Sequence, residues 1–318
     1  MRAPAVVALG GGHGLHATLS ALRRVTGPEH GGELTAVVTV ADNGGSSGRL
    51  RGEFGVLPPG DLRMALAALC GDDEWGRTWA DVLQHRFAGA GEMNGHVVGN
   101  LLIVSLWERL GDHVEALEWV ARLLGAQGRV LPMATVPLDI AADVRGLDAL
   151  DPAGTSTVRG QVEVARTTGE IAAVRLDPPD AAACPQAVAA VREADFVVLG
   201  PGSWFTSVIP HVLVPELRAA LCETSAEVVV VLNLEQQLGE TTGYSPEDHL
   251  EVLLEHVPDL PVHAVVADRR SIADADALGL AVASYGARLV LADVGLDGEE
   301  ARHDPARLAV VLAELFDR

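Results

Sequence analysis

Short apolar runs alternate with segments of helical hydrophobic spacing along this chain. Pro4–Leu9 is a wholly apolar run that ends in glycines, which is typical of a strand buried on both faces of a parallel sheet. Leu34–Val40 has the pattern of a second strand, and leucines recur at helical spacing within Leu15–Val25 between them. This order predicts the first unit of a Rossmann-like, doubly wound α/β fold with a mainly parallel sheet.

The same alternation returns in the second half of the chain. We expect strands at Phe196–Leu199, Val228–Leu232, Val262–Ala267 and Arg288–Ala292. We expect helices at Pro215–Cys222, Pro246–His256, Ala273–Ala283 and Pro305–Phe316. Because parallel strands bring their carboxyl ends to one edge of the sheet, we expect ligands to bind at that edge.

The middle of the chain interrupts this alternation. Asp61–Ala88 and Val97–Leu124 predict a mainly helical block at residues 61–125, and Arg129–Ala134 predicts a strand after it. Short segments with strand patterns predict a small accessory sheet or flap at residues 137–177: Pro137–Arg145, Val158–Arg166 and Ile171–Leu176. We treat residues 1–318 as a single domain that carries both insertions.

The charge and the basic residues exclude several classes of protein. The net charge is −21, and such an acidic surface repels nucleic acid and anionic membranes, so neither is an expected partner. All 23 basic residues are arginine. Because a Walker-A loop and a Schiff-base enzyme each need a lysine, both classes are excluded.

The remaining composition predicts a cytoplasmic protein. Cys70, Cys184 and Cys222 lie far apart and form no pair with metal-ligand spacing, as expected of free thiols in a reducing compartment. No segment approaches the ~20 apolar residues of a membrane span. Met1–Leu9 runs straight into glycines, so we interpret it as the first strand rather than a signal peptide.

A glycine-rich loop follows the first predicted strand and precedes a helix. Its glycines would let backbone N–H groups approach a phosphate, and the amino end of the helix adds positive potential. The segment from Gly12 to Ala17 also fits G-x-G-x-x-A, although a tight turn without a ligand would give the same pattern. The candidate ligand contacts in this loop are Gly10, Gly11, Gly12, His13, Gly14 and Leu15.

The second predicted strand leads into Ala41–Gly60, which we expect to be a long loop. Its candidate ligand-binding residues are Asp42, Asn43, Gly44, Gly45, Ser46, Ser47 and Gly48. Asp42 stands where a Rossmann protein places its ribose-binding acid, and the glycines and serines after it form a predicted anion nest. The pattern G-x-S-x-G around Ser46 also fits a nucleophile elbow. We reject a hydrolase because no helix is expected to follow the serine.

Further candidates follow other predicted elements. Asp61 could cap the next helix, and Arg63 in its first turn is best explained by an anionic ligand. Asp42 and Asp61 could also hold a divalent cation such as Mg²⁺ against phosphate oxygens, although the sequence identifies no metal ligands. The other candidate ligand-binding residues are Arg86, Asn100, Gly200, Pro201, Gly202, Ser203, Thr206 and Asn233.

Taken together, these motifs resemble the gluconeogenesis-factor family, also called the YvcK type. The resemblance rests on Gly-Gly-Gly-His-Gly-Leu, Asp-Asn-Gly-Gly-Ser-Ser-Gly-Arg, Pro-Pro-Gly-Asp-Leu-Arg, Gln-His-Arg-Phe, Gly-His-x-x-Gly-Asn, Leu-Gly-Pro-Gly-Ser-Trp-Phe-Thr-Ser and Gly-Glu-Thr. It extends from about Val6 to His256. The family is related to the 2-phospho-L-lactate transferases of deazaflavin coenzyme synthesis.

The resemblance implies a cytoplasmic regulator that binds a nucleotide sugar such as UDP-N-acetylglucosamine. It links the chain to cell shape and cell-wall precursor supply, with cell-wall-synthesis partners and a homodimer as expectations at the level of the family. In the transferase branch Asp42 would be the catalytic residue. This sequence has Asn43 where the family commonly carries a second aspartate, which puts a metal at that position in doubt.

Three functional hypotheses stay open from the sequence. The first is a nucleotide-sugar-binding regulator without turnover. The second is a transferase of the 2-phospho-L-lactate kind. The third, an NAD-dependent dehydrogenase, ranks last because the Gly/Ser nest after Asp42 is not part of the dinucleotide fingerprint.

Overall fold

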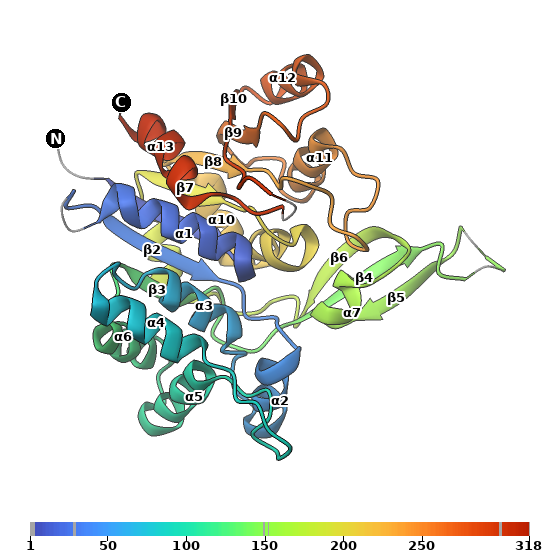
Figure 1. The fold of residues 1–318 in the computed structure, drawn as a ribbon. Coiled ribbons are helices and arrows are strands. Elements are labelled where there is room, and N and C mark those ends of the chain that lie inside the picture. The colour runs from blue at the N-terminus through green and yellow to red at the C-terminus, as the bar shows by residue number, and fades with distance from the viewer. Residues whose placement is uncertain (1–3, 28–29, 149, 152, 299–300, 318) are drawn as a thin grey trace.

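The computed structural model describes residues 4–27, 30–148, 150–151, 153–298 and 301–317, and its centre is a seven-stranded parallel sheet (Figure 1). The strand order is β10-β9-β8-β7-β1-β2-β3. The strands are β1 (Ala5–Gly10), β2 (Glu33–Val38), β3 (Arg129–Pro132), β7 (Phe196–Leu199), β8 (Glu227–Val231), β9 (Val262–Asp268) and β10 (Arg288–Ala292). Each lies within one or two residues of a predicted strand, so the predicted α/β fold with a mainly parallel sheet is confirmed.

The core of the sheet explains the apolar runs of the sequence. Strand β1 lies in the middle, where Leu9 aligns with Val37 of β2 on one side and with Leu199 of β7 on the other. All three side chains are fully buried. A strand covered by helices on both faces has no solvent-facing positions, so its sequence does not alternate between apolar and polar residues.

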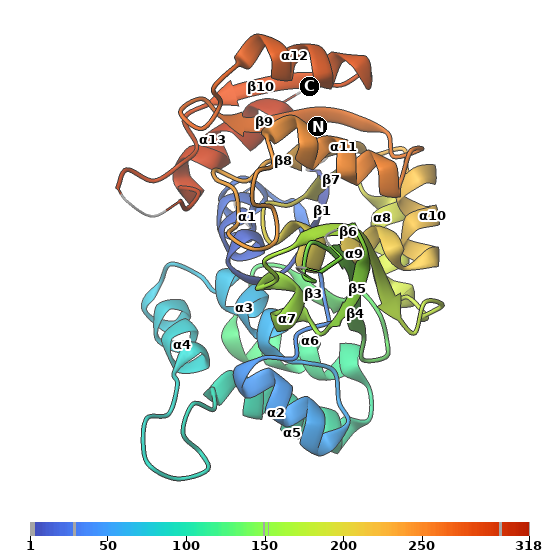
Figure 2. The same ribbon diagram turned by 90° about the vertical axis from the view of Figure 1, so that its right-hand side faces the viewer.

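Helices cover both faces of the sheet. Helices α1 (Gly12–Thr26) and α13 (Pro305–Phe316) lie on one face, and α8 (Pro185–Glu193), α10 (Pro215–Glu223) and α11 (Pro246–His256) lie on the other (Figure 2). Helix α12 (Ala275–Ser284) packs against β10. The sequence pattern did not predict α8, nor the π-helix η1 (Trp204–Val208) that runs into α9 (Ile209–Leu213). Each helix in the described part of the chain is too short or too polar to span a bilayer.

The helical block begins earlier than predicted. Its helices are α2 (Gly45–Phe54), α3 (Gly60–Ala68), α4 (Glu74–Gln84), α5 (Val98–Leu110) and α6 (His113–Leu124). The expectation that Ala41–Gly60 is a loop is therefore wrong. Glycines hid α2 in the sequence, yet Gly48 is required there because a Cβ would lie 1.9 Å from the carbonyl oxygen of Asn43. The expected single helix Asp61–Ala88 is two helices, because Asp73 accepts a hydrogen bond from Gly76 N and starts α4 anew.

The accessory sheet projects from the carboxyl edge of the main sheet (Figure 1). It is antiparallel, with the order β5-β4-β6 formed by β4 (Asp139–Arg145), β5 (Thr155–Arg159) and β6 (Glu170–Asp177). The strand expected at Val158–Arg166 ends at Arg159, and the short helix α7 (Gln161–Ala165) follows. The base of this sheet therefore brings α7 next to the loops that follow the main strands.

Candidate functional site

The loops after β1 and β7 meet where the strand order reverses. β1 and β7 are neighbours, but β1 leads to α1 on one face and β7 leads through η1 and α9 to the other face. Ligands of doubly wound folds bind at such switch points. The two loops touch, since a Cβ on Gly14 would lie 2.0 Å from the carbonyl oxygen of Pro201. Only glycine permits this close approach.

A cavity of about 770 Å³ lies at this switch point. It brings together seven of the predicted site residues: His13, Gly14, Arg63, Arg86, Pro201, Gly202 and Asn233. It also contains residues that the sequence did not single out as ligand contacts, among them His16, Gln237, Arg302 and His303. The last two follow β10, and the rule that carboxyl ends of parallel strands share an edge could have pointed to that loop.

The cavity is lined by both cationic and apolar side chains. Arg63, Arg86 and Arg302 line it, and Glu235 is the one acidic side chain among its described lining residues. Leu234 and Leu296 contribute an apolar wall. In a chain with a net charge of −21, this concentration of arginine favours an anionic ligand that also carries a less polar group.

Arg63 is the most buried of these arginines, at 7% exposure. Its guanidinium donates a hydrogen bond to the amide oxygen of Gln84, and its Nε has no hydrogen-bond partner. Burial, and secondly the charge of Arg86, lower the pKa of Arg63 to about 10, so the group remains charged at neutral pH. A guanidinium that lines a cavity is suited to a phosphate oxygen.

The amino end of α1 faces the same cavity. Its N-cap residue Gly11 makes no side-chain capping hydrogen bond, and the first turn of α1 contains no acidic residue. His13 and His16 line the cavity from the first two turns. Burial lowers the pKa of both imidazoles, with a further lowering from the nearby positive groups, so they act as neutral hydrogen-bonding groups at pH 7. The Gly12 N–H at this end of α1 donates to the Asp61 carboxylate, while His13 and Gly14 of the same turn face the cavity, where the helix dipole favours an anion.

Asp42 and Asp61 lie together on the β2 side of the α1 amino end. A Cβ on Gly60 would lie 3.0 Å from Oδ2 of Asp42, and one on Gly11 would lie 2.8 Å from Oδ2 of Asp61. Burial, and secondly the charge of Asp42, raise the pKa of Asp61 to about 7. The expectation that Asp61 caps α3 is wrong, because Pro59 is the N-cap residue and the Asp61 carboxylate accepts from the Gly12 N–H instead.

Asn43 connects the loop after β2 to the accessory sheet. Its side-chain amide donates to Oε2 of Glu163 over 2.9 Å, and its oxygen accepts from Val162 N over 3.0 Å. Gly44 N donates to Oδ1 of Asp42 over 2.8 Å. Several donors and acceptors of the predicted anion nest therefore form hydrogen bonds within the protein. Asn43 points toward α7 rather than into the cavity.

Ser46 and Asn100 form a buried clamp between α2 and α5. Asn100 Nδ2 donates to Ser46 Oγ over 3.1 Å, Val97 N donates to the same oxygen over 3.3 Å, and Ser46 Oγ lies 3.2 Å from His96 Nδ1. We expected no helix after Ser46, but α2 is present there. The absence of a helix is therefore a wrong reason for rejecting a nucleophile elbow. Ser46 is nevertheless only 4% exposed and its oxygen already accepts two hydrogen bonds, which does not suit a nucleophile.

The turn after β7 differs from the predicted phosphate cradle. Gly202 N donates to Oδ1 of Asn233 over 2.8 Å, and Nδ2 of Asn233 donates back to Gly202 O over 2.9 Å. Trp204 N donates to Oε1 of Gln237 over 3.3 Å. Two side chains from the segment after β8 therefore hold this turn, and Gly202 and Asn233 also line the cavity. Thr206 is fully buried.

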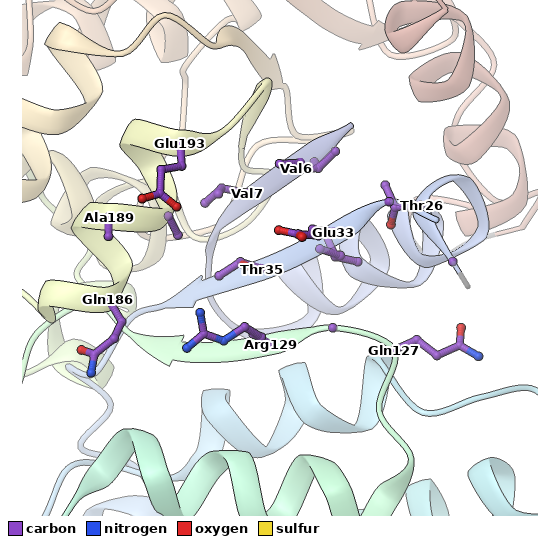
Figure 3. A pocket seen from close by; sticks show the side chains of 16 residues that line it. Val6, Val7, Thr26, Glu33, Thr35, Gln127, Arg129, Gln186, Ala189 and Glu193 are labelled. Carbon is purple, nitrogen blue, oxygen red and sulfur yellow. The ribbon is translucent and has the colours of Figure 1, made fainter. Parts of the chain in front are cut away.

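A second cavity, of about 560 Å³, lies at the other edge of the sheet (Figure 3). Val7, Thr35 and Arg129 form one row of it across the first halves of β1, β2 and β3, and Gln186 and Glu193 of α8 face them. It contains none of the predicted site residues, and the Arg129 guanidinium there is paired with Glu118 over 3.0 Å. The seven predicted residues that line a cavity thus lie at the switch point.

Comparisons with known proteins identify relatives in sequence and in fold. The family model 2-phospho-L-lactate transferase CofD matches residues 6–301. A Mycobacterium tuberculosis protein, whose name assigns it provisionally to the gluconeogenesis factors, is 54% identical over 96% of this chain and 89% of its own length. The gluconeogenesis factor of Listeria innocua is 38% identical over 80% of this chain and 74% of its own length. The crystal structure of a UPF0052 family member from Bacillus halodurans superposes with a TM-score of 0.86 at 29% identity, covering 98% of this chain and 99% of that one.

Proposed function

The chain belongs to the 2-phospho-L-lactate transferase CofD family, and from that membership we propose that it is a gluconeogenesis factor that binds a nucleotide sugar of the UDP-N-acetylglucosamine kind without turning it over. In this proposal it acts in the cytoplasm as a regulator of cell shape and cell-wall precursor supply. A homodimer and cell-wall-synthesis partners belong to the same proposal.

One observation carries the proposal: first-turn residues of α1 and the buried Arg63 line one cavity at the switch point. A diphosphate would accept hydrogen bonds from the first-turn amides of α1 and from the guanidinium of Arg63. Arg86 and Arg302 would balance its second charge. The apolar wall at Leu234 and Leu296 would face the base or the sugar.

Ligand-dependent stabilisation tests this proposal. A ligand that binds only the folded state raises its stability by RT ln(1 + [L]/Kd), which is about 2.7 kcal/mol at a hundred times Kd. UDP-N-acetylglucosamine is therefore expected to raise the melting temperature by several degrees, and uridine without the diphosphate to raise it much less. Absence of any shift at millimolar UDP-N-acetylglucosamine would exclude this ligand.

The carboxylate pair favours a second candidate, a transferase of the 2-phospho-L-lactate kind. Asp42 and Asp61 stand beside the open end of α1, where the reacting phosphate of an activated donor would lie. In this case Asp42 would be catalytic, by positioning a divalent cation or by accepting a proton from the attacking hydroxyl. Incubation with a deazaflavin alcohol and a nucleotide-activated lactyl phosphate donor tests it. Product is expected from the unchanged chain and none from Asp42→Asn.

The donors around this pair suit a hard cation. Asp61 Oδ2 and Ser207 Oγ lie near Gly11, and Asp42 Oδ2 lies near Gly60, so the side-chain atoms available here are oxygen ligands. The described residues contain no group of three or more His, Cys, Asp or Glu side chains that could hold a metal. Mg²⁺ would therefore depend on the phosphate oxygens of the ligand for the rest of its coordination, which is its common mode beside nucleotides.

A further inference from the structure

Glu240 is a buried carboxyl next to the turn that follows β7. Its side chain is 3% exposed. The hydroxyls of Ser203 and Thr206 and the N–H groups of Phe205 and Thr206 face it closely enough to stabilise its charge. Even so, neither carboxyl oxygen has a hydrogen bond of normal geometry, and Oγ1 of Thr206 is unpartnered as well. Such a buried and incompletely bonded acid is costly to keep charged.

The chain around Glu240 fixes the position of this carboxyl. Gln237 N donates to Oγ1 of Thr241 over 2.9 Å, and Thr241 N donates back to Gln237 O over 2.9 Å. Gly239 lies against α7, where a Cβ would come within 2.8 Å of the Ala165 carbonyl oxygen. The carboxyl is therefore held in place by bonds on both sides of it in the sequence.

The turn after β7 separates Glu240 from the cavity. Pro201 and Gly202 line the cavity, whereas Ser203 and Thr206, which face Glu240, do not. An anion in the cavity and an ionised Glu240 would thus be separated by residues of this short turn, and Glu240 itself lies in the protein interior. Two like charges in such a medium repel each other strongly, and the carboxyl can relieve the repulsion by binding a proton.

Resting on the proposed function, we propose that Glu240 is a positioning residue that binds a proton when the anionic group of the ligand enters the cavity. The protonated carboxyl would donate a hydrogen bond to the Thr206 or Ser203 hydroxyl and hold the turn in its ligand-binding form. Ligand affinity is then linked to pH through a group that never touches the ligand.

Of the titratable side chains that pack around this turn, Glu240 has the pKa nearest neutral pH. Burial has the largest effect on the pKa of Glu240 and raises it to about 7. The nearby hydrogen-bond donors lower this pKa by less than burial raises it. Tyr244 and His249 pack on Phe205 and Trp204; burial raises the pKa of the phenol and lowers that of the imidazole, so both are neutral at pH 7. The charged residues on the adjoining helices are Glu163 of α7 and Arg166 at its end, and Glu247, Asp248, Glu251 and Glu255 of α11.

Calorimetric titration with UDP-N-acetylglucosamine between about pH 6 and pH 8.5 tests the proposal. The diphosphate diester of this probe gains and loses no proton in that range. The Kd of the unchanged chain is expected to rise with pH, by about tenfold for each pKa unit that the ligand adds to Glu240. Glu240→Gln should bind with less pH dependence, and Glu240→Asp should restore it. Glu251→Gln, which neutralises an exposed carboxylate on α11, should match the unchanged chain.

The contrary outcomes separate this inference from the proposed function. If Glu240→Gln binds with the slope of the unchanged chain, Glu240 takes up no proton and the inference is overturned, while the ligand assignment stands. If no UDP-N-acetylglucosamine binds at all, the same pH series is repeated with sulfate, whose charge does not change in this pH range. The sulfate series then tests the role of Glu240. A pH-dependent sulfate affinity lost in Glu240→Gln supports the inference, and no difference or no binding overturns it.

A direct reading of the carboxyl covers the case in which Glu240→Gln does not fold. Carbon-13 NMR of the Glu240 carboxyl in the unchanged chain gives its apparent pKa with and without saturating probe. The proposal requires that this pKa rises on saturation. An unchanged value contradicts it.

Discussion

The turns after β1 and β7 look alike in sequence and differ in what their amides contact. Both are glycine-rich, both follow a buried strand and both precede a helix. The amino end of α1 is bonded by a side chain at the Gly12 N–H, through Asp61, and its residues His13 and Gly14 face the cavity, whereas the amides of Gly202 and Trp204 are bonded to Asn233 and Gln237. Whether a turn can bind phosphate thus depends on which of its backbone N–H groups are not already bonded within the protein. In the β7 turn, side chains from the segment after β8 occupy these groups.

The closest approach of the two turns predicts the largest effect. Gly14→Val would place side-chain atoms against the Pro201 carbonyl, where even a Cβ comes within 2.0 Å. We expect a loss of more than about 4 kcal/mol in the free energy of unfolding, measured by denaturant titration. Gly12→Ala is the matched control, because its φ of +57° is strained for alanine but its Cβ meets open space. It should cost about 1 kcal/mol, and equal losses in both variants would show that the turns are not in contact.

The acid beside the β1 turn predicts a pH effect. The pKa of Asp61 is raised from 3.8 to about 7, so the folded state binds its proton more tightly than the unfolded state. The chain should therefore lose stability as pH rises from about 4 to about 7, by roughly 2–4 kcal/mol in total. Asp61→Asn should remove this part of the dependence of the free energy of unfolding on pH. Above pH 7 the variant should be more stable than the unchanged chain. Unfolding curves across this range check it, and an unchanged slope would contradict the raised pKa.

The bonds that occupy the β7 turn predict an intermediate effect. Asn233→Ala removes both hydrogen bonds between that side chain and the peptide of Gly202. We expect a loss of about 1–3 kcal/mol in the free energy of unfolding, because two backbone groups are left without their partners. Thr242→Ala, which removes one exposed hydrogen bond to Gly239 N, should cost less than about 1 kcal/mol. If Asn233→Ala is neutral, the β7 turn does not depend on this clamp.

The link between the β2 loop and the accessory sheet predicts the smallest effect. Asn43→Asp would put a second carboxylate against Glu163, where the amide now donates a hydrogen bond. Because the pair is solvent-exposed, we expect a loss of only about 0.5–1 kcal/mol, and the loss should shrink in high salt. Asn43→Asp combined with Glu163→Gln should recover most of it. A salt-independent loss would point to backbone strain instead of charge.

The sequence predicted the strands of the main sheet and the edge at which their loops meet, but not which hydrogen-bond donors of those loops are already bonded. Apolar runs located the strands because burial on both faces leaves no polar positions, and parallel connections then fixed the edge at which the loops meet. Helix α2 was missed because Gly45, Gly48 and Gly52 suggest a loop, while the need for Gly48 is visible only from its contact with Asn43. Asn233, Gln237 and Glu240 act on a turn some thirty residues earlier in the chain, and no local pattern reveals such a contact.

The central claim is that an anionic group of a nucleotide sugar binds between the amino end of α1 and Arg63. The most direct measurement is the affinity for UDP-N-acetylglucosamine of the unchanged chain, of Arg63→Gln and of Arg109→Gln, an exposed arginine on α5. The account predicts a loss of about 10- to 100-fold for Arg63→Gln, since a charge-assisted hydrogen bond is worth about 1.5–3 kcal/mol, and no change for Arg109→Gln. Equal affinities in all three proteins would contradict it.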